Sequence, residues 1–167
     1  MKPWLRLLLV MASVGGGFAG MALTTVEFAH AHSAVRVMLS MLFLGLYGFV
    51  TASGLIFVHD PKRTRPLVAA LALQIPWISS PVFVYQFAAA LCAAITLGTP
   101  EETNRIGIHF GGSLFFGAHF QFRFGSSVDV PISVGVNVAA LVLLFLLLRA
   151  NQIRVQTPDL PMPIRPA

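Results

Sequence analysis

Two histidines form the pair of side chains in this sequence most suited to binding a metal. His30 and His32 would share one face of an extended segment, because side chains two residues apart point the same way there. Imidazole nitrogens ligate Zn²⁺ and Cu²⁺, so the pair predicts a metal site that Glu27, Glu101 or Glu102 would complete. The alternative is that both histidines hydrogen-bond water and lipid headgroups.

A second group of polar side chains surrounds two prolines five residues apart, Pro76 and Pro81. Each proline removes a backbone donor and disfavours helix in the residue before it, so a helix through this region must break. The polar side chains available to the freed carbonyl groups are Gln74, Ser79, Ser80, Tyr85 and Gln86. Broken helices of this kind form binding sites in transporters. The alternative is a simple kink that its own serine hydroxyls satisfy.

The sequence contains no recognisable arrangement for catalysis. The GxSxG, HExxH, P-loop and dinucleotide-binding patterns are missing, and no pair of carboxylates lies within an apolar segment. Cys92 is the single cysteine and has no second thiol for an intramolecular disulfide. None of the histidines lies deep in an apolar segment, as haem ligation between helices would require. We therefore predict a protein that is not an enzyme and has no cofactor.

The composition indicates which elements must position these groups. Of 167 residues, 56% are hydrophobic and 10% are charged, whereas soluble domains carry about 25% charged residues. A water-soluble globule is therefore not expected. The net charge of +5 comes from cations beside apolar runs, without the interleaved aromatic residues of a nucleic-acid site, so no nucleic-acid partner is predicted.

Four stretches without charged residues predict four transmembrane helices, at about 5–26, 37–58, 66–97 and 130–148, within one domain that covers residues 1–150. A spanning helix needs about 17–25 residues. The third stretch exceeds that length, so we expect a kinked helix there, with a re-entrant hairpin as the alternative. The first stretch also resembles a cleavable signal peptide.

Small residues at helical spacing predict that the first two helices pack together. They are Gly16 and Gly20 in the first helix, and Gly48 and Ala52 in the second. Such spacing lets two helix backbones approach closely.

The distribution of Lys and Arg predicts the orientation in the membrane, because cations are enriched in cytoplasmic connections. In the four-helix arrangement, eight cations lie on one side and three on the other. This distribution predicts an inner-membrane protein with both termini in the cytoplasm. It also places His59–Arg63 at a cytoplasmic turn, where each cation would attract anionic headgroups by about 1 kcal/mol.

The connection over residues 98–129 is predicted to lie outside. His119 to Phe124 alternate polar and aromatic residues, which predicts a strand. Gly111 to Ser113 could turn a hairpin whose other arm is Ile106 to Phe110. A fifth spanning helix from Ile106 to Phe124 is the alternative, and its polar residues oppose it. The tail, 151–167, contains four prolines and is predicted to be extended and disordered.

Together these patterns predict an all-α integral membrane protein, a four-helix transmembrane bundle with a kinked third helix and a small β-hairpin-like extracytoplasmic connection. The expected function is that of an accessory, scaffold or assembly subunit of a membrane complex. The alternative is a small oligomeric transporter or channel whose binding site is the broken helix at 74–86. The expected partners are the lipid bilayer and either other membrane subunits or a second copy of this chain.

Overall fold

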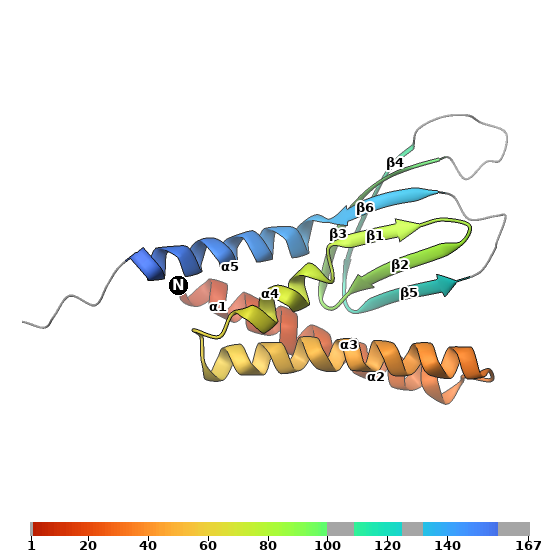
Figure 1. Ribbon diagram of the computed structural model, residues 1–167, viewed down its shortest axis with the longest axis horizontal. Coiled ribbons are helices and arrows are strands. Elements are labelled where there is room, and N and C mark those ends of the chain that lie inside the picture. The colour runs from red at the N-terminus through yellow and green to blue at the C-terminus, as the bar shows by residue number, and fades with distance from the viewer. Residues whose placement is uncertain (1, 100–108, 125–131, 157–167) are drawn as a thin grey trace, which may run out of the picture.

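The computed structural model describes residues 2–99, 109–124 and 132–156. These residues form a long helical hairpin, two further helices and a six-stranded antiparallel sheet that lies beside the hairpin (Figure 1). The rest of the predicted tail and of the 98–129 connection, including Glu101 and Glu102, lies outside the described residues.

The hairpin is the part of the fold that the apolar pattern predicts correctly. Its first arm is a continuous helical run of α1 (Pro3–Val10), a π-helical turn η1 (Met11–Gly15) and α2 (Gly16–Ala29), and its second arm is α3 (Ala34–His59). Both arms are long and apolar enough to cross a membrane, with mean hydropathies of 1.8 and 2.0. At 1.5 Å per residue each arm is about 40 Å long.

The prediction of one kinked helix over 66–97 is wrong, and so is the re-entrant alternative. This segment contains α4 (Arg65–Ala72), β1 (Pro76–Ser79), β2 (Phe83–Ala88) and β3 (Leu91–Gly98). The helix ends at Ala72, before either proline: Pro76 begins a strand and Pro81 lies in the turn after that strand, so neither proline kinks a helix. An unbroken apolar run has no periodicity that separates a buried strand from a helix.

The fourth predicted span is also wrong in its first part. Residues Ser133–Asn137 form β6, and α5 begins directly after it and covers Val138–Gln156. The apolar part of α5, Val138–Gln152, is shorter than the two hairpin arms. Within the described ranges only the hairpin arms qualify as membrane spans, so the all-α four-helix bundle is overturned.

The sheet has the strand order β4-β3-β6-β1-β2-β5. The predicted strand at His119–Phe124 is confirmed as β5, but the predicted hairpin turn at Gly111 to Ser113 lies inside β4 (His109–Phe116). The chain reverses instead at Gly117, whose φ of 138° favours glycine. β4 and β5 then pair with different strands, β3 and β2, and form the two edges of the sheet. The fifth helical span is likewise wrong.

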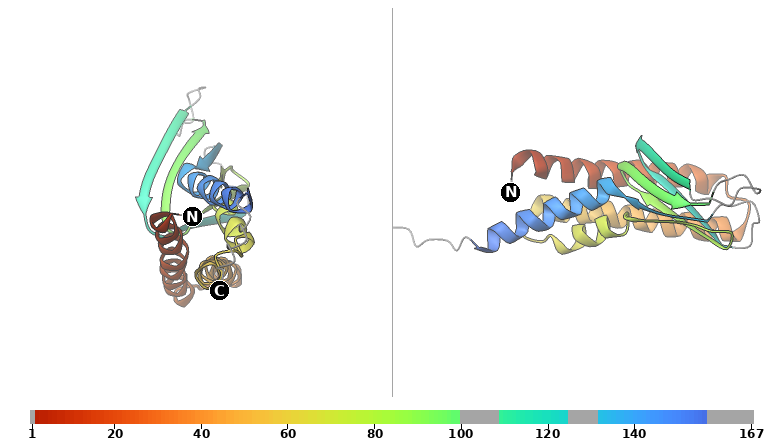
Figure 2. Two further views of the ribbon diagram at one scale, coloured as in Figure 1. Left: turned by 90° about the vertical axis from the view of Figure 1, so that its left-hand side faces the viewer. Right: turned by 90° about the horizontal axis from the view of Figure 1, so that it is seen from above.

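The sheet curls, and one part of its outer surface packs on the hairpin. Phe115 on β4 and His119 on β5 come from opposite edges, yet their rings are 5.3 Å apart. The end-on view in Figure 2 shows the curvature of β3 and β4. On the opposite face, Phe120 of β5 stacks on Phe43 of α3 with ring centroids 4.4 Å apart, and Phe87 of β2 lies 4.9 Å from Tyr47.

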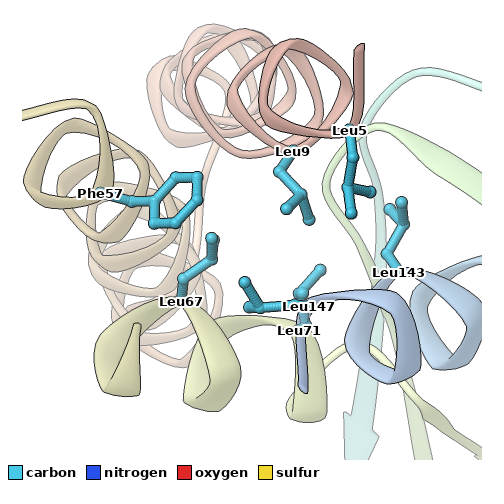
Figure 3. Packing of buried hydrophobic residues seen from close by; sticks show 7 residues of the cluster. All are labelled: Leu5, Leu9, Phe57, Leu67, Leu71, Leu143 and Leu147. Carbon is cyan, nitrogen blue, oxygen red and sulfur yellow. The ribbon is translucent and has the colours of Figure 1, made fainter. Parts of the chain in front are cut away.

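At the other end of the molecule, α1, α3, α4 and α5 surround a core of leucines and one phenylalanine (Figure 3). Its buried members are Leu5, Leu9, Phe57, Leu67, Leu71, Leu143 and Leu147. The side chains point toward one another from four helices, and this packing joins α4 and α5 to the hairpin.

The small residues proposed for helix packing have different surroundings. A Cβ on Gly20 would meet the ring of Tyr47, so Gly20 lies at the contact between α2 and α3. A Cβ on Gly16 would instead meet the backbone of Ala89, at the turn between β2 and β3. The nearest atom to a Cβ on Gly48 is the Met21 sulfur at 3.9 Å, and Ala52 is exposed.

Candidate functional site

The two histidines proposed as metal ligands lie at the turn between α2 and α3. His30 and His32 are both exposed, and the His30 Nδ1 lies 2.8 Å from the Val26 carbonyl oxygen. Across the described ranges no three His, Cys, Asp or Glu side chains are close enough to hold a metal ion. The described geometry therefore adds no support to the metal site.

Three of the five polar side chains from 74–86 bond to backbone groups. Gln74 is buried: its Nε2 donates to the Ala70 carbonyl at 3.0 Å, and its Oε1 accepts from the Ala89 N–H at 2.9 Å. Gln74 thus joins α4 to the β2–β3 turn. The Ser80 hydroxyl accepts from the Phe83 N–H at 2.9 Å in the turn after β1.

Tyr85 also bonds to the backbone, donating from its hydroxyl to the Leu73 carbonyl at 2.7 Å. It lies on the side of the sheet that packs on the hairpin, because Tyr85 and Phe87 are alternate residues of β2 and point the same way. The structure therefore does not bring the five polar groups into one site.

The remaining two, Ser79 and Gln86, lie on the concave surface of the curled sheet, which we call the inner face. Direct partners in an antiparallel pair share a face and alternate residues do too, so the register defines its members. Its members include Trp77, Ser79, Val84, Gln86, Ala88, Cys92, Ala94, Thr96, Ser113, Phe115, His119, Gln121, Arg123 and Asn137. Its middle is apolar and buried at Trp77, Val84, Ala88, Cys92 and Ala94. Its two edges carry exposed polar residues, Ser113 on β4 and Gln121 and Arg123 on β5.

His119 is the central polar group of the inner face. Its Nε2 lies 3.3 Å from the Gln86 Oε1, so a proton on Nε2 would be donated to that oxygen. Its ring is 5.9 Å from Trp77 and 5.3 Å from Phe115. Burial among these rings lowers the pKa of His119 below its ordinary value of 6.5, so the imidazole is neutral at pH 7.

Cys92 is fully buried on the same face. Burial raises the pKa of its thiol to about 11, and a backbone hydrogen bond with Ala94 opposes that shift. The thiolate is the reactive form of cysteine, so a thiol that stays protonated at neutral pH is a poor nucleophile. The inner face therefore offers hydrogen bonds and aromatic contacts, and its one thiol is not an activated nucleophile.

Trp77 is the one buried polar side chain that the described residues leave unsatisfied. It is 6% exposed, and its indole Nε1 has no hydrogen-bond partner among them. An unmade bond at a buried donor costs about 1–3 kcal/mol. Sequence reasoning missed Trp77 because its segment was assigned to a helix. His119, Gln121 and Arg123 could have been grouped from the alternation in β5.

The opposite side of the sheet, which we call the outer face, is apolar and in part uncovered. Leu114 of β4 is 78% exposed, Val134 of β6 61% and Ile95 of β3 60%, and Leu97 and Val136 are also exposed. No described strand places a charged side chain on this face. An antiparallel sheet in water turns a polar face to the solvent, whereas the uncovered part of this face is apolar.

Comparison with known proteins identifies no relative. No protein-family model matches the sequence, and no curated protein or solved structure is significantly similar to it. The function is therefore argued from the geometry of this chain.

Proposed function

We propose that this chain is a non-enzymatic integral membrane protein that acts as an accessory subunit of a membrane complex and docks through the outer face of its sheet. The observation that carries the proposal is the exposed apolar surface of an open sheet beside two helices that are long enough to cross a membrane.

The arrangement of the hairpin and the sheet supports membrane embedding. Each hairpin arm, at about 40 Å, exceeds the roughly 30 Å hydrocarbon core. The sheet lies along the half of the hairpin that contains α2 (Figure 1), so a bilayer around the hairpin also reaches the outer face. Exposed apolar side chains continue along the helices, for example Phe18, Met38 and Phe145. Such an extended apolar exterior is stable against lipid or protein, but not against water.

A protein partner, rather than lipid alone, is favoured by the edges of the sheet. In the described strands β4 and β5 each pair on one side only. Unpaired backbone groups in hydrocarbon cost several kcal/mol each, and lipid cannot bond to them. We therefore propose another membrane subunit, or a second copy of this chain, as the partner at the outer face.

The orientation is proposed from the positions of the cations. The N-terminus, the α3–α4 connection and the C-terminal part of α5 lie toward the same end of the molecule (Figure 1). These segments contain Lys2, Arg6, Lys62, Arg63, Arg65 and Arg149. We place this end at the cytoplasmic side of the inner membrane.

Photo-cross-linking from single positions tests the docking surface. A benzophenone residue at Leu114 or at Val134 should give adducts with another protein in living cells. The same residue at Phe18, which is 68% exposed on α2, is the control and should give few. Adducts of twice the 18.0 kDa chain mass would identify a second copy. The proposal would be contradicted if neither Leu114 nor Val134 gave a protein adduct and the chain purified as a monomer.

A small-solute transporter is the second candidate, and the polar inner face with its unpartnered Trp77 donor favours it. The version that uses a broken helix at 74–86 does not stand, because that segment is mainly strand. Substitution of Gln86 or His119 by Leu should then abolish solute flux in proteoliposomes. Unchanged flux would exclude this candidate.

A further inference from the structure

We infer that the groove at the C-terminal end of α3 binds an anionic phospholipid, with the headgroup phosphate on Arg63 and an acyl chain along Leu55 and Ile56. The inference rests on the membrane embedding in the proposed function and adds a specific lipid ligand to it.

The groove is an open depression of about 700 Å³. It is lined by Leu55, Ile56, His59, Asp60 and Arg63. The two apolar side chains are 54% and 40% exposed, and they lie about one helical turn, or about 5 Å, below His59 along α3. Polar groups at one end and an uncovered apolar wall at the other match a headgroup followed by an acyl chain.

Asp60 contacts Lys62 and Arg63 but does not pair with the whole Arg63 guanidinium group. Its Oδ1 accepts from the Lys62 backbone N–H at 3.0 Å, and its Oδ2 lies 3.4 Å from the Arg63 Nε. No described residue bonds to the two terminal nitrogens of Arg63, and this side chain is 77% exposed. Those nitrogens retain the fork geometry that binds two phosphate oxygens. Lys62, the preceding residue in the chain, adds a second cation to this turn.

The net charge of this end favours an anion. Arg6 reaches the same place and donates from Nη2 to the Val58 carbonyl at 2.9 Å, which ties the start of α1 to the end of α3. Arg65 begins α4 directly after the groove. Asp60 is the single carboxylate that lines the groove in the described part of the chain. An anionic lipid is therefore favoured over a zwitterionic one, by about fivefold for each cation near the surface.

Lipid retention by the full chain tests the inference. The protein, purified in detergent, is given equal amounts of phosphatidylglycerol and phosphatidylcholine, and bound lipid is counted by native mass spectrometry. We expect about a 25-fold preference for phosphatidylglycerol, about fivefold for each of Arg63 and Lys62. Arg63→Gln should lower this preference about fivefold, whereas Arg36→Gln, at the opposite end of the hairpin, should not change it. Leu55→Gln should weaken lipid retention without removing the preference for anions.

Three results would overturn the inference. Equal retention of both lipids, or an unchanged preference in Arg63→Gln, would show that this groove does not select the headgroup. Displacement of phosphatidylglycerol by millimolar inorganic phosphate would assign the site to free phosphate. In each of these cases the sheet cross-links are unaffected, and the proposed function stands. A chain that retains neither lipid and stays soluble without detergent would instead contradict the membrane embedding itself.

Discussion

The helical end of the molecule and the inner face of the sheet are both largely enclosed, but they are built from different residues. Seven apolar side chains from four helices fill the first. The second combines Trp77, Phe115 and Cys92 with His119 and Gln86, and it leaves the indole N–H without a described partner. The leucine core thus stabilises the fold by apolar packing. The inner face instead keeps a buried N–H group without a hydrogen bond, which lowers the stability of the folded state.

The largest effect is expected in the leucine core. Leu9→Ala should lower the free energy of unfolding by about 3 kcal/mol, because Leu9 is 1% exposed and its loss leaves a cavity between the four helices. The measurement is unfolding in detergent followed by circular dichroism. Leu7→Ala, two residues away and 61% exposed, is the control and should change little. Similar losses in both variants would mean that these four helices do not form a specific core.

The junction between the hairpin and the sheet should be nearly as sensitive. Gly16→Ala should cost about 2 kcal/mol, because the new Cβ meets the backbone of Ala89, which cannot rotate away. Gly15→Ala is a matched control, since nothing lies within 4 Å of a Cβ there. It should be neutral or stabilising by up to about 1 kcal/mol. If both variants unfold alike, the sheet does not pack on α2 as described.

Gln74 and Gln86 belong to one polar group in the sequence, but their substitutions should change the free energy of unfolding by different amounts. Gln74→Met should cost about 2 kcal/mol, because the buried Ala89 N–H loses its acceptor. Gln86→Met should cost less than about 1 kcal/mol, because its bond to His119 is long and partly exposed. Equal costs in chemical unfolding would remove the distinction between a structural and an inner-face glutamine.

Trp77→Phe tests the cost of the unpartnered donor. The variant should change stability by less than about 1 kcal/mol, because removing an unsatisfied N–H offsets the smaller ring. Tyr47→Phe is the comparison: its hydroxyl donates to the Ala88 carbonyl at 3.3 Å, so its removal should cost about 1 kcal/mol. A larger loss for Trp77→Phe than for Tyr47→Phe would indicate that the indole N–H has a partner.

The smallest effect is expected from titration of His119. Because burial lowers its pKa below 6.5, the unfolded chain binds more protons than the folded one as the pH falls below that value. This contribution to stability is present above pH 6.5 and is lost as the pH falls through the folded pKa. The Tm should therefore fall on acidification, and by less in His119→Gln. The exposed His32→Gln should behave like the unmodified chain, and a pH dependence that His119→Gln leaves intact would place the proton elsewhere.

Part of this architecture is readable from local pattern. The absence of charge over 7–26 and 37–58 identifies the hairpin, since a helix of that length satisfies its own backbone groups. The period-two alternation from His119 to Phe124 identifies β5 and groups the polar side chains of its inner face. Neither pattern depends on a distant partner in the chain.

The apolar run over 66–97 shows where local pattern is not enough. Whether such a run becomes helix or strand depends on what pairs with it, and its partners are far away: β3 pairs with β6, so that Ile95 lies opposite Val136. Local pattern also fails for the edge strands of the sheet. The two-residue link between β4 and β5 is typical of a hairpin, but β4 pairs with β3 and β5 pairs with β2.

The sequence by itself determined the hairpin and the alternation of β5. It also determined that Lys and Arg occur at the N-terminus and in the α3–α4 connection. Only the tertiary structure decided that 76–98 is sheet, that Trp77 and His119 meet on its inner face, and that Leu114 and Val134 stay uncovered. The physical reason is that helices close their hydrogen bonds within the segment, whereas strands close theirs across contacts that no local pattern specifies.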